Sequence, residues 1–265
     1  MDFMNDDELK LQLNQNLFNQ LNLDEDEQQE SMKKVEEVVD DWKNMEFVTT
    51  EKRLLYILLV DHSGSTSTFI NEINDGLRNL VRTTQQHEGA DAFDLMVFPF
   101  STNVEELINS PVRDVDVDAI KPLKPEGLTR LDLALKTACE EMEGYKNGLG
   151  RNKMSPDYWR PYIIIISDGL PTDEHGKYLD AEGRGRLVSM CQGTIIKDKH
   201  ASIFTFFVGR DQDGADFLKQ LASKGSAFQI ESTGEKIHQM FELLSESVRV
   251  TQANKTDFTD PQFEP

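Results

Sequence analysis

The sequence predicts an α/β fold in which a mostly parallel central sheet carries helices on both faces. Two observations lead to this prediction: uninterrupted apolar runs recur along the chain, and stretches with apolar residues at helical spacing alternate with them. The chain has 265 residues, of which 38% are apolar, which suits one such core with polar extensions. We therefore expect one α/β domain flanked by polar segments.

The first half of the domain begins with the strand predicted for residues 54–60. This run is apolar throughout, as in a strand that is buried on both faces. Apolar residues at helical spacing predict a helix over 70–81, and residues 93–98 predict the next strand. Residues 100–104 begin a short irregular or antiparallel segment, and a helix is expected over 131–142.

The second half repeats this alternation. The run 162–167 predicts a central strand, and an apolar stripe at 187–195 predicts the helix that follows. Residues 203–208 predict another strand, 217–221 a short helix, and 227–230 an edge strand. Helical crossovers between consecutive strands imply that most of the pairing is parallel.

The last helix and the two ends of the chain delimit three expected regions. An apolar stripe at 237–248 predicts the final helix, so the domain is expected to cover residues 51–250. The tail, 251–265, is polar and acidic with two prolines, which is typical of a mobile tail or a docking strand. Residues 1–50 form the third region, an acidic N-terminal extension.

Two apolar stripes predict that this N-terminal extension is helical. A leucine occupies every fourth position from Leu9 to Leu21, and a second stripe runs from Val35 to Met45. The acidic run 24–27 separates them. Such stripes pack either on the parent domain or on another chain, and the separating linker leads us to expect a separate docking surface.

Charge excludes some classes of partner. The formal net charge is -20, and residues 1–50 contain 14 acidic and four basic residues. Nucleic acids and anionic membranes are therefore not expected as partners, because phosphate binding relies on Lys and Arg. A basic protein surface could accept this charge, or the charge could serve solubility alone. The longest apolar runs, about seven residues, are too short to span a membrane.

The N-terminus and the cysteines predict a cytoplasmic location. Residues 1–5 lack the basic start and apolar core of a secretory signal. Cys139 and Cys191 both fall on apolar stripes of predicted helices, which favours packed free thiols over a disulfide. Free thiols are consistent with a reducing compartment.

Three loops at strand exits or helix entries offer hard oxygen ligands. Asp61, Ser63 and Ser65 occupy alternate positions in the turn after the first strand, Thr129 precedes the helix at 131, and Asp168 follows the central strand. Open α/β sheets bind ligands at the carboxyl ends of their strands. Oxygen ligands with few charges suit Mg²⁺, with Mn²⁺ as the alternative. For the first turn taken alone, a helix cap would be the simpler interpretation.

The order of these residues resembles the metal-ion-dependent adhesion site (MIDAS) of von Willebrand factor A (VWA) domains. The shared pattern is Asp-x-Ser-x-Ser, then Thr, then Asp-Gly, and the resemblance covers roughly residues 52–250. It implies a Rossmann-like VWA fold with Asp61, Ser63, Ser65, Thr129 and Asp168 around the metal. The chain departs from the family pattern at His62 and Thr66 and by having Leu128 in place of a glycine. The stretch 167–173 is similar to bacterial intracellular members of the TerY-like, tellurium-resistance-associated group.

The resemblance also implies a function. It suggests a divalent-cation-dependent protein–protein interaction module rather than an enzyme, in which a protein partner donates a carboxylate to the metal. The TerY-like similarity suggests an intracellular adaptor in a bacterial stress-response or antiviral defence complex, with a kinase or phosphatase as the partner. Two other classes remain open. One is a metal-dependent phosphohydrolase that uses Asp61 as nucleophile or ligand and Asp168 as second carboxylate; the other is a metal-independent scaffold.

Other polar motifs have simpler interpretations. An EF-hand is excluded because the acidic run that begins at Asp114 has Ala119 where the calcium loop needs glycine and Pro125 where it needs glutamate. Asp211 is expected to cap a helix.

Two histidines and two carboxylates lie beside the predicted ligand loops. His62 and His175 are expected at the surface or next to the ligands rather than as bases. Asp173 and Glu174 are expected either to accept hydrogen bonds beside the site or to start a helix, the helix start being the preferred interpretation.

Overall fold

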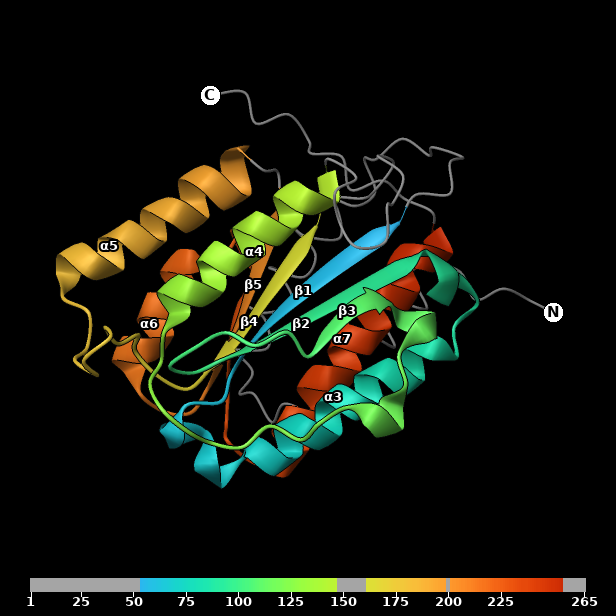
Figure 1. Ribbon diagram of the computed structural model, residues 1–265, viewed down its shortest axis with the longest axis horizontal. Coiled ribbons are helices and arrows are strands. Elements are labelled where there is room, and N and C mark those ends of the chain that lie inside the picture. Colours follow the sequence, from blue (N-terminus) through green and yellow to red (C-terminus); the bar gives the residue numbers. More distant parts are fainter. Residues whose placement is uncertain (1–52, 147–160, 199–200, 255–265) are drawn as a thin grey trace, which may run out of the picture. The chain divides into compact units, whose positions relative to one another are not determined.

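The computed structural model describes residues 53–146, 161–198 and 201–254 (Figure 1). The two predicted N-terminal stripes, from Leu9 to Leu21 and from Val35 to Met45, lie outside the described residues. The part of the expected tail beyond Asn254 lies outside them as well.

A six-stranded sheet in the order β3-β2-β1-β4-β5-β6 forms the centre of the domain. Every pairing is parallel except β2 with β3, which is antiparallel. The predicted α/β architecture with a mostly parallel sheet is thus confirmed, including the edge strand at 227–230. The strands are β1 (Leu54–Asp61), β2 (Phe93–Phe100), β3 (Ile108–Pro111), β4 (Tyr162–Ser167), β5 (Ser202–Val208) and β6 (Ala227–Ile230).

The apolar runs form strands because both faces of the sheet are covered. Every residue of β1, β2 and β4 is buried, as expected for central strands of an α/β sheet. The register places Val60 of β1 beside Ile166 of β4. The next residues, Asp61 and Ser167, therefore reach the same edge of the sheet.

Helices α4, α5 and α6 cover one face of the sheet, and α3 and α7 cover the other (Figure 1). Asp180 and Asp211 cap α5 and α6, because their carboxylates accept hydrogen bonds from the backbone N–H of Gly183 and Gly214. The predicted cap at Asp211 is confirmed. No helix in the described ranges is long and apolar enough to cross a bilayer. The helices are α3 (Ile70–Gln85), α4 (Leu131–Lys146), α5 (Ala181–Ser189), α6 (Gln212–Leu221) and α7 (Gly234–Asn254).

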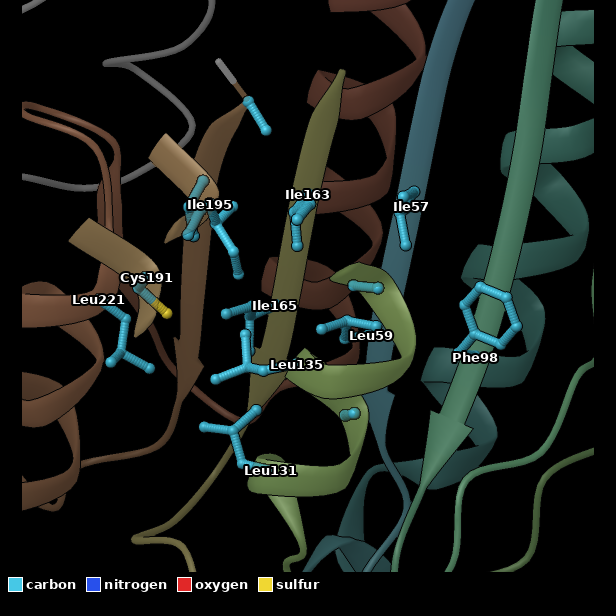
Figure 2. Close-up of a cluster of buried hydrophobic side chains, with 14 of the residues drawn as sticks. Ile57, Leu59, Phe98, Leu131, Leu135, Ile163, Ile165, Cys191, Ile195 and Leu221 are labelled. Carbon is cyan, nitrogen blue, oxygen red and sulfur yellow. The ribbon is translucent and has the colours of Figure 1, made fainter. Parts of the chain in front are cut away.

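One hydrophobic cluster joins the sheet to the α4 side (Figure 2). Alternate residues of β1, Ile57 and Leu59, belong to this cluster together with Leu135 of α4, and Leu59 lies near Leu135 (Figure 2). Cys191 is fully buried in the same cluster, and both cysteines are free thiols. The expectation of packed thiols rather than a disulfide is confirmed.

The helix predicted around 187–195 changes type partway along. It begins as α5 and continues as a π-helical segment, Met190–Asp198. Leu187, Cys191 and Ile195 are all buried, four residues apart. Residues at this spacing lie on one face of either helix type, so periodicity could not distinguish them.

Candidate metal centre

The candidate site lies where the strand order reverses. From β1 the chain adds β2 and β3 on one side, then returns to add β4, β5 and β6 on the other. The crevice outside the carboxyl ends of β1 and β4 is the usual ligand position of such sheets. Asp61 ends β1, and Asp168 directly follows β4.

Asp61 is buried and uses both of its carboxylate oxygens. Its Oδ1 accepts a hydrogen bond of 2.8 Å from the backbone N–H of Ser63, and its Oδ2 accepts one of 2.6 Å from the hydroxyl of Ser167. The turn tightens further because the hydroxyl of Thr66 donates to the carbonyl of Ser63 at 2.8 Å. These bonds fix the direction in which the turn presents its hydroxyl groups.

The serines connect this turn to the exit of β4. The hydroxyl oxygens of Ser63 and Ser65 are 3.1 Å apart. The hydroxyl of Ser65 donates to Asp168 Oδ1 at 2.8 Å. Asp61, Ser63, Ser65 and Asp168 thus form one group of oxygen atoms drawn from two strand exits.

Thr129 is buried beside this group but is held through its backbone. Its N–H donates to the hydroxyl of Thr172 at 3.0 Å, and the N–H of Thr172 donates to the carbonyl of Thr129 at 2.9 Å. The N–H of Gly64 also reaches the carbonyl of Gly127 at 3.4 Å. The Thr129 hydroxyl is not part of the hydrogen-bonded chain that runs from Ser63 to Asp168, although its loop adjoins the Asp61 turn.

Burial makes both carboxylates more basic than usual. Loss of solvent raises the pKa of Asp61 to about 6, with a further rise from the charge of Asp168 and a partial offset by the bond from Ser167. Burial also raises the pKa of Asp168, against the lowering effect of the Ser65 hydrogen bond. Two such carboxylates favour a positive ligand between them.

The donor set fits a small hard cation. Neighbouring oxygens of an octahedral Mg²⁺ shell lie about 3.0 Å apart when the bonds are about 2.1 Å long. The separations from Ser63 to Ser65 and from Ser65 to Asp168 are 3.1 and 2.8 Å. Within the described ranges no three His, Cys, Asp or Glu side chains cluster together, so hydroxyl groups supply part of this donor set. That each predicted residue is a metal ligand stays a prediction.

The preferred prediction for one segment near the site was wrong. Asp173 and Glu174 start no helix; the Oδ1 of Asp173 accepts from the N–H of His175 and of Lys177, which closes a tight turn. A carboxylate followed by polar residues is compatible with either structure, so the local sequence did not decide. His62 takes the second of its two expected positions, buried next to Asp61, and its Nδ1 lies 2.8 Å from the carbonyl oxygen of Lys124. His175 is exposed, as expected.

Ser167 and Thr172 were missed as residues that shape the site. Ser167 holds Asp61, and Thr172 holds the backbone of Thr129. A signal for Ser167 was present, because it is the last residue of the apolar run before Asp168. Assigning it a role requires the register that places it opposite Asp61, and a single sequence does not supply that register.

Solved structures of VWA domains share this fold. The pilus adhesin SpaC from Lactobacillus rhamnosus GG matches with a TM-score of 0.58 at 11% identity, over 76% of this chain and 30% of that one. The von Willebrand factor domain of the pili tip protein Mfa5 from Porphyromonas gingivalis matches with a TM-score of 0.56 at 12% identity, over 76% of this chain and 97% of that one. Proximal thread matrix protein 1 from the mussel byssus, with a zinc-occupied MIDAS motif, matches with a TM-score of 0.51 at 15% identity, over 80% of this chain and 50% of that one.

These comparisons define the class of fold. The chain spans about half the length of the mussel protein, covering 48% of it in a second structure at 16% identity. No family model and no curated protein matches the sequence. Likeness at these identities shows the fold alone, and that fold is the VWA fold.

Proposed function

We propose that this chain is a divalent-cation-dependent protein–protein interaction module. The observation that carries the proposal is the group of oxygen atoms from Asp61, Ser63, Ser65 and Asp168 at the point where the strand order reverses. The group combines two carboxylates with neutral hydroxyls. A cation bound by so few charges remains electrophilic and can take a further anionic ligand.

The described residues suggest how Mg²⁺, or Mn²⁺, would be held. The hydroxyls of Ser63 and Ser65 and the carboxylate of Asp168 are suited to direct contact. Asp61 is suited to contact through water, because each of its oxygens already accepts a hydrogen bond. Thr129 would add a hydroxyl from a third loop. When bound, the cation supplies a position for a carboxylate from a protein partner.

The acidic charge of the chain explains why a cation would help a partner to bind. A chain with a net charge of -20 repels an acidic partner at long range. A divalent cation at the carboxyl edge would neutralise the two site carboxylates and give an acidic partner a positive centre to bind. Two of the proteins with the same fold are described as a pilus adhesin and a pili tip protein, which supports an interaction role. The zinc-occupied MIDAS of the mussel protein supports a divalent metal.

The cellular setting rests on the sequence. The similarity of residues 167–173 to TerY-like proteins leads us to propose a cytoplasmic adaptor in a bacterial stress-response or antiviral defence complex, with a kinase or phosphatase as partner. The two free thiols support a reducing compartment. The acidic net charge supports a protein partner over nucleic acid or a membrane.

The geometry supports binding over hydrolysis. A nucleophilic Asp61 would need a free oxygen facing substrate, yet its side chain is buried and both oxygens accept hydrogen bonds. Arg130, the cation beside the Thr129 loop, directs its guanidinium to Asp132 at 2.8 and 2.9 Å instead of toward a phosphate. We therefore propose a module that is not an enzyme.

Calorimetric titration with Mg²⁺ tests the proposal. Asp61→Ala and Asp168→Ala should each lower the affinity at least about tenfold while the circular dichroism spectrum stays native, because each removes a carboxylate from the site. Asp213→Ala, at an exposed carboxylate on α6, is the matched control and should bind as the unaltered chain does. Unchanged affinity in both site variants would overturn the metal assignment. Phosphate release from a generic ester would favour a hydrolase instead.

A further inference from the structure

A long connection between β3 and α4 is fastened to α3 by polar side chains. Gln85 Nε2 donates to the carbonyls of Val112 and Val115 at 2.9 and 2.8 Å. Arg78 Nη2 donates to the carbonyl of Ile120 at 3.2 Å. The connection thus runs antiparallel to α3: the closer a residue of the connection is to Thr129, the closer its partner is to the N-terminus of α3.

Asn74 holds the next point of the connection. It is buried in α3, its Nδ2 donates to the carbonyl of Leu123 at 3.0 Å, and its Oδ1 accepts from the N–H of Leu123 at 2.7 Å. A buried amide destabilises the fold unless both of its ends are bonded. Here both ends bond one residue, so Asn74 specifies where Leu123 lies relative to α3.

His62 holds the residues that follow. Because its Nδ1 lies 2.8 Å from the Lys124 carbonyl, this nitrogen carries the proton and donates it. The carbonyl of His62 accepts from the N–H of Glu126 at 2.9 Å, and its own N–H donates to the carbonyl of Phe100 at 3.0 Å. His62 thereby ties the turn of Asp61 to the segment that leads to Thr129.

We infer that Asn74 and His62 are positioning residues for the Thr129 loop, defined here as residues 123–129. Through them, α3 and the Asp61 turn set where Thr129 lies relative to Ser63 and Ser65. The inference deepens the proposed function, because it rests on Thr129 contributing to the same cation site. Gln85 fastens the far end of the connection and does not position the loop.

Hydrogen exchange of the metal-free full-length chain tests the positioning directly. The informative amides are those of Thr129 and Arg130, which donate to Thr172 and Ser101, groups that the variants leave in place. Asn74→Ala and His62→Ala should speed their exchange at least about tenfold by allowing the loop to open. Gln85→Ala, which removes two hydrogen bonds from the same connection, should leave both amides unchanged.

Conservative variants separate positioning from general destabilisation. His62→Asn keeps a donor near the Nδ1 position and should restore slow exchange. Asn74→Asp keeps the acceptor for Leu123 and takes the place of Asn74→Ala if that variant does not fold. Equal exchange in all variants, or equal acceleration by Gln85→Ala, would overturn the inference.

Mg²⁺ titration of the same variants adds the functional readout. Asn74→Ala and His62→Ala should weaken Mg²⁺ binding by about three- to tenfold, as expected when one ligand loop is displaced. Gln85→Ala should bind normally. If the unaltered chain binds no Mg²⁺, the proposed function fails, and the exchange rates still decide whether these two residues position the loop.

Discussion

Two opposing demands meet at Asp61: a metal ligand there should be ionised, whereas its buried position favours the protonated form. The proposed metal site needs an ionised carboxylate there, but burial and the neighbouring Asp168 raise the pKa of Asp61 to about 6. Serine donors offset only part of this effect. A bound cation would favour the ionised form, so metal binding and deprotonation of Asp61 are coupled.

We predict that Mg²⁺ binding weakens as the pH falls below about 6, the pKa of Asp61. Protonated Asp61 must lose its proton before it can hold the metal, so affinity should fall toward tenfold per pH unit below that value and stay flat from about pH 7 to 8. Burial also raises the pKa of Asp168, which acts in the same direction. Calorimetry between about pH 5 and pH 8 measures this. Equal affinities at both ends of the range would contradict it.

We also predict that Asp61→Asn stabilises the metal-free chain at neutral pH. The folded-state pKa of Asp61 is about 6, above its usual value of 3.8, so its contribution favours folding in acid and is lost as the pH rises through about 6. Asparagine avoids the buried charge and should raise the free energy of unfolding by about 2 kcal/mol at about pH 7.5. Urea unfolding in EDTA measures the difference, which should shrink toward about pH 4. If the Asp61→Asn variant were instead less stable than the unaltered chain at neutral pH, burial of this charge would be harmless.

At the scale of the elements, the apolar runs predicted the strands well because burial on both faces leaves few other structures for them. The runs at 54–60 and 162–167 became the central pair β1 and β4. The irregular or antiparallel segment expected to start at 100–104 contains one isolated antiparallel bridge, and the antiparallel strand β3 follows it at Ile108–Pro111. The three loops that contain the predicted ligand residues were also placed correctly, at strand exits and before α4; that they bind a metal stays a prediction. These predictions succeeded because apolar runs and helical spacing can be read from neighbouring residues in the sequence alone.

Features that depend on contacts between residues far apart in the sequence were not predicted. The role of Ser167 depends on its register with Asp61, and the hydrogen-bond partner of His62 is the carbonyl of Lys124, 62 positions away in the sequence. The π-helical segment shares its apolar spacing with an α-helix. These features are set by tertiary contacts that a single sequence does not reveal.

The contact between α3 and α7 predicts opposite effects for two glycine substitutions. A methyl group at Gly76 would overlap the ring of Phe241 on α7, whereas one at Gly185 on α5 would meet nothing within 4 Å. Gly76→Ala should destabilise by about 1–3 kcal/mol through overpacking, and Gly185→Ala should stabilise by about 0.5–1 kcal/mol through helix propensity. Urea unfolding of both variants tests this. A stabilised Gly76→Ala chain would mean that α3 and α7 separate easily.

At the scale of the whole molecule, half of the net negative charge and all of the proposed metal ligands lie in different parts of the sequence. Residues 1–50 contain 14 acidic and four basic residues, while all five proposed ligand residues lie between Asp61 and Asp168. The proposed cation site therefore draws all of its candidate ligands from the described part of the chain. We expect the acidic extension to act on it only through the long-range field, which salt screens.

Deleting residues 1–48 should accordingly leave Mg²⁺ affinity unchanged within about twofold at about 0.15 M salt, with a modest loss at low ionic strength. Calorimetry at two salt concentrations measures both effects, and the full-length chain is the control. The deletion should also remove a binding partner if the two predicted apolar stripes form a docking surface. Loss of the cooperative melt would show instead that the stripes belong to the core of the domain.

The pairing of β1 with β4 gives the site a role in folding. Ser167 reaches Asp61 across 106 positions of the chain, and Ser65 reaches Asp168 across 103. Contacts this distant close large loops and form late, after much of the chain has been ordered. A cation held by both strand exits would thus bind only the finished topology, and it would slow unfolding more than it speeds folding. Partner binding would then depend on complete folding, because an incompletely folded chain could not hold the cation that the partner contacts.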